Sequence, residues 1–93
     1  MNYRFPESRF TSNSIPKQFF AVLSECFEVA KAFVCRDWQH MIVECYDVIH
    51  TTETLIRIIV IKYNVSALLA RKTVRLKNEM RGYYIGTNTN IKK

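Results

Sequence analysis

Residues 24–54 read SECFEVAKAFVCRDWQHMIVECYDVIHTTET, and this stretch decides the fold. Apolar residues recur in it every three or four positions, which is the repeat of an amphipathic helix. The triplet CRD at 35–37 interrupts the pattern, and Asp37 is a residue type that caps the start of a helix. The stretch therefore predicts two consecutive helices joined by a short turn.

The periodic pattern extends beyond this stretch on both sides. Pro16 suits the first turn of a helix, and the first predicted helix covers residues 17–34. The second begins at Asp37 and continues to about residue 63 without Gly or Pro. Its final run, IRIIVIKY, is rich in β-branched residues, but it continues the helical repeat with no turn signal before it. We therefore expect helix here, and no strands.

A third helix is predicted after the polar break YNVS at 63–66. Either Asn64 or Ser66 suits a cap at this break, the helix covers residues 67–81, and Gly82 is placed for its C-terminal cap. The predicted fold class is all-α, a helical bundle of three to four helices.

Length and composition predict how this bundle is completed. The chain has 93 residues, which predicts a single domain over residues 1–93. Its hydrophobic content is 48%, and a few short helices cannot bury so much apolar surface within one chain. We therefore expect homo-oligomerisation to complete the bundle. The polar, aperiodic sequences of residues 1–14 and 86–93 predict flexible ends.

The cysteines and the apolar runs indicate the compartment. Cys26, Cys35 and Cys45 are odd in number and show no C-x-x-C spacing, so we interpret them as free thiols of a reducing environment. The N-terminus lacks the apolar core of a signal peptide, and the longest aliphatic run, residues 58–61, is too short to span a bilayer. The expected location is the cytoplasm, with no membrane partner.

Charge is divided unevenly along the chain. Residues 1–56 carry 5 basic and 7 acidic side chains, whereas residues 57–93 carry 9 basic and 1 acidic. This asymmetry predicts an anionic partner near the C-terminal part, either a phosphorylated small molecule or nucleic acid. Nucleic acid is the less favoured partner, because no helix-turn-helix spacing is visible.

Carboxylates recur on the predicted helices beside Phe, Val, Ile and Tyr. Glu25 and Glu28 are three residues apart in the first helix, and Glu44 and Asp47 repeat this spacing in the second. Each pair alone suits the solvated face of an amphipathic helix. The polar stripes are narrow, however, and if the helices pack antiparallel the four carboxylates converge and repel unless a cation neutralises them. Mg²⁺, which takes oxygen ligands, is the predicted cation, with Mn²⁺ as the alternative.

The spacing of these acids is similar to a known signature. Glu25-x-x-Glu28, 15 intervening residues and Glu44-x-x-Asp47 resemble the E-x-x-E…E-x-x-D motif of the MazG-like, all-α nucleoside triphosphate pyrophosphohydrolases. The sequence LSECFEVAKAF resembles the first motif helix of that family, and VECYDVIHTTETLIRI resembles the second. KNEMRGYYIG is similar to the basic segment that closes many short bacterial and phage-encoded members. The resemblance covers roughly residues 15–85.

The resemblance implies an Mg²⁺-dependent enzyme that hydrolyses a (d)NTP to the (d)NMP and pyrophosphate. It implies a homodimer or a dimer of dimers, in the host cytoplasm if a phage encodes the protein. The catalytic and metal-binding residues that it implies are Glu25, Glu28, Glu44 and Asp47. The nucleotide- and phosphate-binding residues that it implies are Lys77, Asn78, Arg81 and Tyr83.

Two positions near the motif leave alternatives open. Many family members carry a further acid directly before the first motif glutamate, and here this position is Ser24. One alternative is therefore a catalytically weak or inactive protein of the same fold that binds and sequesters a nucleotide. Another, suggested by the basic residues of the range 57–93, is a basic helical module that binds nucleic acid. His40, one turn before Glu44, is either a contact to substrate or to a metal ligand, or a solvent-exposed histidine at a helix start.

Overall fold

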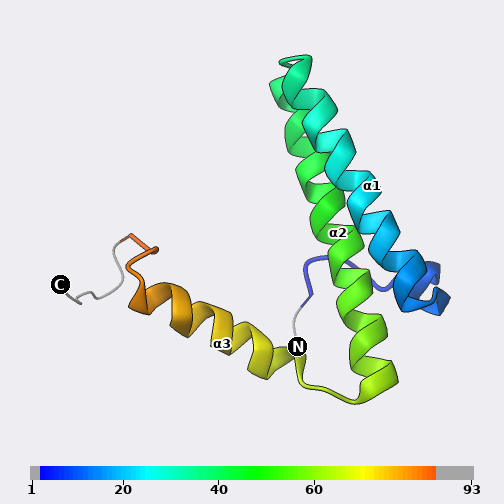
Figure 1. Cartoon of the computed structure of the whole chain (residues 1–93), viewed down its shortest axis with the longest axis vertical. Helices are drawn as coiled ribbons and strands as arrows, with labels where there is room; N and C mark the ends of the chain where they lie inside the picture. The colour runs from blue at the N-terminus through cyan, green and yellow to red at the C-terminus, as the bar shows by residue number, and fades with distance from the viewer. Residues whose placement is uncertain (1–2, 86–93) are drawn as a thin grey trace.

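The computed structural model describes residues 3–85, and all regular structure within them is helical (Figure 1). A short 3₁₀-helix, η1 (Arg9–Ser12), precedes three α-helices, α1 (Ile15–Val34), α2 (Trp38–Tyr63) and α3 (Ala67–Met80). The predicted all-α class is confirmed, and no strand occurs between residues 3 and 85.

The helix boundaries follow from local capping chemistry. Ser14, Asp37 and Ser66 each accept a hydrogen bond from the backbone N–H three residues further on, at 3.0–3.2 Å, which satisfies a free donor of the first turn. Of the two caps predicted at the second break, Ser66 begins α3 and Asn64 ends α2 in the left-handed conformation, with φ 53°. Gly82 follows α3 with φ 72°, a backbone region that glycine adopts without steric cost.

Helices α1 and α2 form an antiparallel hairpin (Figure 1). Only residues 35–37 join them, and the N–H of Asp37 donates to the carbonyl of Ala32 at 3.1 Å across this turn. A connection this short places consecutive helices side by side and antiparallel. Few residues of the two helices are buried, and they include polar as well as apolar side chains: Gln18, Ala32, Glu44, Thr54 and Ile58.

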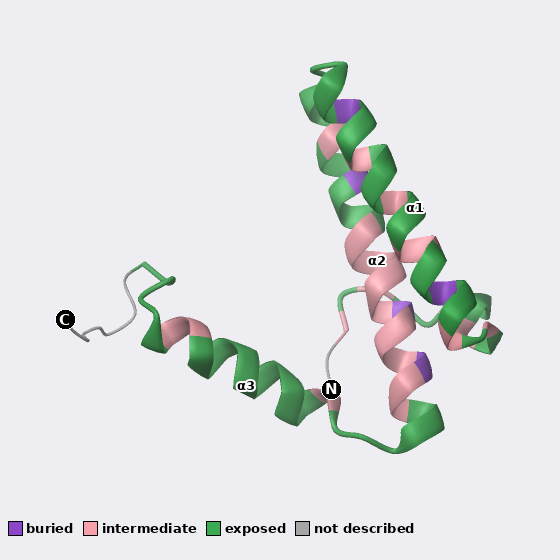
Figure 2. Ribbon diagram, viewed as in Figure 1, coloured by how far each residue is buried: buried purple, intermediate pink, exposed green. Residues whose placement is uncertain are grey.

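Helix α3 extends away from the hairpin, and most of its surface is exposed (Figures 1 and 2). The predicted packing of three helices into one bundle is therefore not present within residues 3–85 of a single chain. The hairpin also leaves large apolar side chains in water, with Phe27 75% and Val34 74% exposed. Other exposed apolar side chains of the hairpin are Phe19, Phe33, Trp38, Ile42, Val43 and Tyr46.

The N-terminal segment lies against α2 (Figure 1). Flexibility was expected over residues 1–14, but Glu53 of α2 accepts hydrogen bonds from the backbone N–H groups of Arg4 and Phe5 at 2.8 and 3.0 Å. These contacts attach the described part of the segment, from residue 3, to the hairpin. The other expected flexible end, residues 86–93, lies outside the described residues.

Two further expectations concern the thiols and the membrane. Cys26, Cys35 and Cys45 are exposed and carry free thiols, as predicted. None of the helices described here combines the length and the apolar character needed to cross a bilayer.

Candidate metal centre

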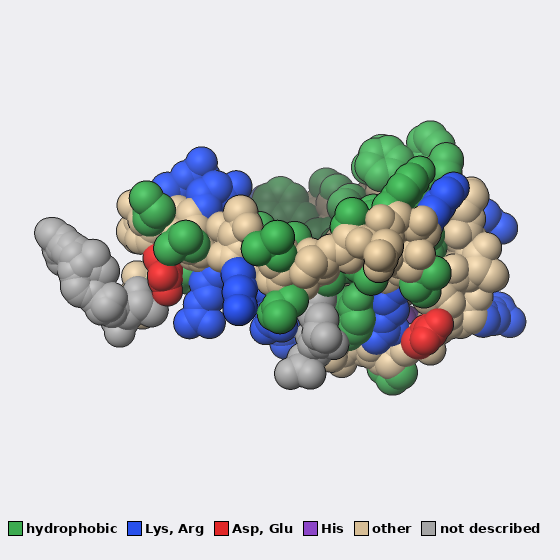
Figure 3. All heavy atoms as spheres, turned by 90° about the horizontal axis from the view of Figure 1, so that it is seen from below, with side chains coloured by type: hydrophobic (Ala, Val, Ile, Leu, Met, Phe, Trp, Pro, Cys, Tyr) green, Lys and Arg blue, Asp and Glu red, His purple; other side chains and the backbone are tan. Residues whose placement is uncertain are grey.

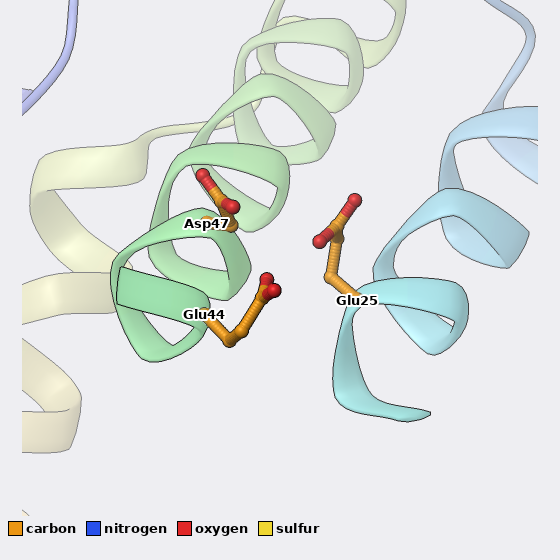
Figure 4. A group of neighbouring side chains, drawn as sticks. All are labelled: Glu25, Glu44 and Asp47. Carbon is orange, nitrogen blue, oxygen red and sulfur yellow. The ribbon is translucent and has the colours of Figure 1, made fainter. Parts of the chain in front are cut away.

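Three carboxylates meet between α1 and α2 (Figure 4). Glu25 projects from α1 toward Glu44 and Asp47 on α2, and one oxygen of each side chain lies within 4.8 Å of the others. Glu25 and Asp47 are equally distant along the chain from Arg36 in the turn, so an antiparallel hairpin places them at the same level along the two helices. We call Glu25, Glu44 and Asp47 the acidic cluster.

Glu28 is the predicted acid that stands outside this cluster. It lies one turn after Glu25 on α1, and its side chain is exposed. Its charge nevertheless contributes to raising the pKa of Glu25. The role of all four acids as metal ligands stays a prediction, and for Glu28 it requires the side chain to turn inward.

The cluster concentrates negative charge at partly buried positions. Glu44 is only 8% exposed, Glu25 is half-buried and Asp47 is exposed. Burial raises the pKa of Glu25 above its ordinary value of 4.5, and the charges of Asp47, Glu44 and Glu28 raise that pKa further. No Lys or Arg side chain within residues 3–85 forms an ion pair with the cluster. Within these residues, the negative charge of the cluster is therefore not balanced by Lys or Arg.

His40 is the one cationic partner type that contacts the cluster within the described part of the chain. Its Nε2 lies 2.8 Å from Oε2 of Glu44, one helical turn further along α2. The His40 side chain is 55% exposed, whereas that of Glu44 is 11% exposed. The imidazole thus holds the Glu44 side chain through one of its two carboxylate oxygens.

The donor set fits a hard divalent cation. All three groups of the cluster offer carboxylate oxygens, which suits Mg²⁺ or Mn²⁺ better than zinc. Mg²⁺ binds oxygens at about 2.0–2.1 Å, so ligand oxygens on opposite sides of the ion are about 4.2 Å apart and neighbouring ones about 3 Å apart. The three oxygens of the cluster lie within 4.8 Å of one another, so one ion can bind all three once the side chains rotate closer together. Three carboxylates leave further octahedral positions for water or phosphate oxygens.

A groove of about 630 Å³ opens beside the cluster, and Glu25 and Asp47 belong to its wall. A molecule bound in the groove would therefore touch two of the three carboxylates. Lys17 is the one Lys or Arg side chain among the described residues that lines it. The remaining lining residues come from the N-terminal segment, α1 and α2: Ser8, Phe10, Asn13, Gln18, Phe20, Ala21, His50, Thr51 and Thr54.

Sequence reasoning missed most of this groove. It assigned no role to Lys17 or His50, and it placed Phe10 in a flexible end. A signal for Lys17 exists, because Lys17, Ala21 and Glu25 are spaced by four residues and so share one face of α1. The aromatic wall from the N-terminal segment had no such signal, since that segment shows no helical repeat.

The four residues predicted to bind nucleotide and phosphate lie elsewhere in the chain. Lys77 and Asn78 are on α3, and Arg81 and Tyr83 are in the turn that follows it. The Arg81 guanidinium lies 5.9 Å from the centre of the Tyr83 ring. Figure 3 shows Lys and Arg side chains gathered along α3 with hydrophobic side chains between them. None of the four lines the groove beside the acidic cluster in this single chain.

Comparisons of the chain with protein-family models, with curated proteins and with solved structures find no match.

Proposed function

We propose that this protein is a Mg²⁺-dependent nucleotide pyrophosphohydrolase of the MazG-like type, which converts a (d)NTP to the (d)NMP and pyrophosphate. One observation carries the proposal: two antiparallel helices hold carboxylate oxygens of Glu25, Glu44 and Asp47 within 4.8 Å of one another, next to an open groove. The spacing of these acids along the sequence, with the resemblance that it carries, supplies the reaction type.

The proposal gives each residue of the cluster a role. Glu25, Glu44 and Asp47 would hold the divalent ion, and His40 would orient Glu44. Glu28 would join them once its side chain turned inward. When bound, the ion contributes charge neutralisation at the phosphate oxygens. A water oxygen bonds to the α-phosphorus, the bond from that phosphorus to the oxygen bridging to the β-phosphate breaks, and pyrophosphate leaves. The proton released by the water passes to a carboxylate of the cluster.

The substrate needs cationic contacts as well as metal ligands. Lys17 supplies one at the groove of the same chain. Lys77 and Arg81 would reach a triphosphate there only if α3 came from a second copy, because α3 extends away from its own hairpin. The exposed apolar faces of the hairpin support such a second copy. The proposed assembly is accordingly a homodimer or a dimer of dimers.

A binding protein of the same fold is the second candidate. The observation that favours it is Ser24, an exposed residue of α1 at the position where many MazG-like enzymes carry a further acid. Such a protein would hold the nucleotide through the same cluster and groove but would turn it over slowly or not at all. Turnover measured beside binding stoichiometry separates the two candidates.

The test is a pyrophosphate-release screen over the common and modified (d)NTPs with Mg²⁺, run beside an EDTA control. We expect pyrophosphate and a monophosphate from at least one nucleotide, and neither in EDTA. Glu44→Gln should remove the activity, whereas the matched change Glu79→Gln, on α3, should retain it. Orthophosphate as the first product, or activity that persists in EDTA, would show that the reaction is assigned wrongly.

A further inference from the structure

The N-terminal segment is attached to α2 by recognition of its backbone. We call residues 3–8 the strap. Both oxygens of Glu53 are engaged by it: Oε2 accepts from the N–H of Arg4 at 2.8 Å, and Oε1 accepts from the N–H of Phe5 at 3.0 Å. One turn further along α2, the guanidinium of Arg57 donates to the carbonyl of Phe5 at 2.7 Å. These are three charge-assisted hydrogen bonds to two residues, which is a strong attachment for a chain end.

Ring contacts reinforce the same attachment. The Phe5 ring stacks on His50 with centroids 4.8 Å apart, and the Arg57 guanidinium lies 4.1 Å from the centre of the Tyr3 ring. The residues of α2 that hold the strap thus include His50, which also lines the groove. Glu53 belongs to this attachment and not to the acidic cluster, although it lies on the same helix as Glu44 and Asp47.

The strap continues directly into one wall of the groove. Ser8 is its last residue, and Phe10 and Asn13 follow through η1; all three line the groove. The amide of Asn13 donates to Oε1 of Gln18 at 2.8 Å, and Gln18, only 3% exposed, donates to the carbonyl of Thr51 at 3.0 Å. The wall is therefore fixed at two ends, by the strap attachment and by the buried Gln18.

We propose that Glu53 and Arg57 are positioning residues that hold the strap on α2 and thereby set the shape of the groove that receives the nucleoside part of the substrate. The aromatic ring of Phe10 and the amide of Asn13 suit the face and the edge of a nucleobase. The identity of the ligand rests on the proposed function, but the attachment of the strap does not. Release of the strap frees the wall at one of its two ends and leaves the acidic cluster unchanged, because the wall and the cluster share no residue.

Amide hydrogen exchange of the full chain, followed residue by residue, tests the attachment. The variants are Glu53→Ala, Glu53→Gln and Arg57→Ala, with Glu79→Ala as the matched control on α3. The informative amides are those of Thr11 and Asn13. The N–H of Thr11 donates to the carbonyl of Ser8 and that of Asn13 to the carbonyl of Phe10, so neither donates to Glu53. Loss of hydrogen bonds to a charged group should speed their exchange roughly ten- to hundred-fold. Exchange in the hairpin at Ala32 and Ile58 should stay as in the wild type.

Two comparisons make the exchange result decisive. Glu53→Gln retains an acceptor and the fold, so its effect should lie between those of the wild type and Glu53→Ala. The double variant Glu53→Ala/Arg57→Ala should exchange about as fast as the more severe single variant, because both residues hold the same strap. Unchanged exchange at Thr11 and Asn13, or acceleration that includes Ala32 equally, would overturn the proposal.

Nucleotide affinity tests the consequence for the groove. Binding of the α,β-methylene analogues of the four common dNTPs is measured with Mg²⁺, beside Mg²⁺ binding alone. We expect Glu53→Ala and Arg57→Ala to weaken nucleotide binding roughly ten-fold or more, with Mg²⁺ affinity unchanged. Wild-type affinity in a variant whose strap has been released would overturn the role of this wall. If the wild type binds none of the analogues, the proposed function fails, and the exchange result still decides the attachment of the strap.

Discussion

Replacing Glu25 by Gln removes one charge from the acidic cluster and keeps the shape of the side chain. In the metal-free protein, that charge faces the carboxylates of Glu44 and Asp47 within 4.8 Å. Two unit charges at this separation repel by about 1 kcal/mol in water and by about 3 kcal/mol at an effective dielectric constant of ~20. The lower value describes the pair with Asp47, since Asp47 is exposed and solvent screens it. The higher value describes the pair with the buried Glu44, so the two repulsions together amount to at most about 4 kcal/mol. Because the side chains can rotate apart and relieve part of this repulsion, we expect Glu25→Gln to raise the free energy of unfolding by about 1–4 kcal/mol.

Thermal melts followed by circular dichroism measure this effect. A gain of about 1 kcal/mol corresponds to a rise in Tm of roughly 4–8 °C for a domain of this size. With Mg²⁺ the wild type should melt at a higher temperature than Glu25→Gln. The ion stabilises the wild type by binding the folded cluster, and Glu25→Gln offers it fewer charged ligands. All melts use one protein concentration, since the stability of an oligomer depends on it.

The control is Glu79→Gln, which neutralises a carboxylate of α3 that lies 3.7 Å from Arg75. It should not raise the Tm in EDTA, and it should leave the response to Mg²⁺ intact. If Glu25→Gln lowers the Tm in EDTA, the carboxylate stabilises the folded chain, and the argument from repulsion is refuted.

The remaining predictions concern pH, phosphate contacts and assembly. The pKa of Glu25 is raised above 4.5 in the folded protein, so the charged carboxylate destabilises the fold at a pH above the raised pKa. This destabilisation is lost as the pH falls to 4.5, because the carboxyl group is then protonated. The gain in Tm that Glu25→Gln gives in EDTA should therefore be largest at neutral pH and vanish near pH 4.5. Lys77→Ala and Arg81→Ala should each lower kcat/KM roughly ten- to hundred-fold, while Lys72→Ala on the same helix should change it little; equal losses in all three variants would indicate diffuse electrostatic attraction. Sedimentation at micromolar concentration should show a dimer or tetramer, and Phe27→Glu, at a 75% exposed position, should shift it toward smaller species; a wild-type monomer would contradict the proposed assembly.

The hairpin could be predicted from the sequence because its signals are local. Asp37 and Ser66 are side chains that cap helices through their own first turn, and Gly82 suits a positive φ that other residues adopt at a cost. The acidic cluster could be predicted for a related reason. A turn of three residues makes the helices antiparallel, and residues equally distant from that turn, such as Glu25 and Asp47, then lie at the same level, where side chains on the facing sides of the helices meet.

The strap and the direction of α3 could not be predicted in this way. Glu53 and Arg57 contact mainly backbone groups of residues 4 and 5, and every residue carries those groups, so no side-chain pattern marks the partners. The residues between α2 and α3 likewise carry no signal for the direction of α3. Their caps determine where α2 ends and where α3 begins, but not the direction in which α3 extends. Glu28 shows the limit of spacing itself, because one helical turn carries it from the cluster to an exposed position.

A titration with Mn²⁺ followed by electron paramagnetic resonance tests the central claim most directly, because it detects the cation at the cluster without any nucleotide. The account predicts one class of saturable site on the wild-type chain, displaced by Mg²⁺. It also predicts loss of that site in Glu25→Gln and in Asp47→Asn, and its retention in Glu79→Gln. A wild-type chain that binds no Mn²⁺ at millimolar concentration, or variants that bind it as the wild type does, would contradict the account.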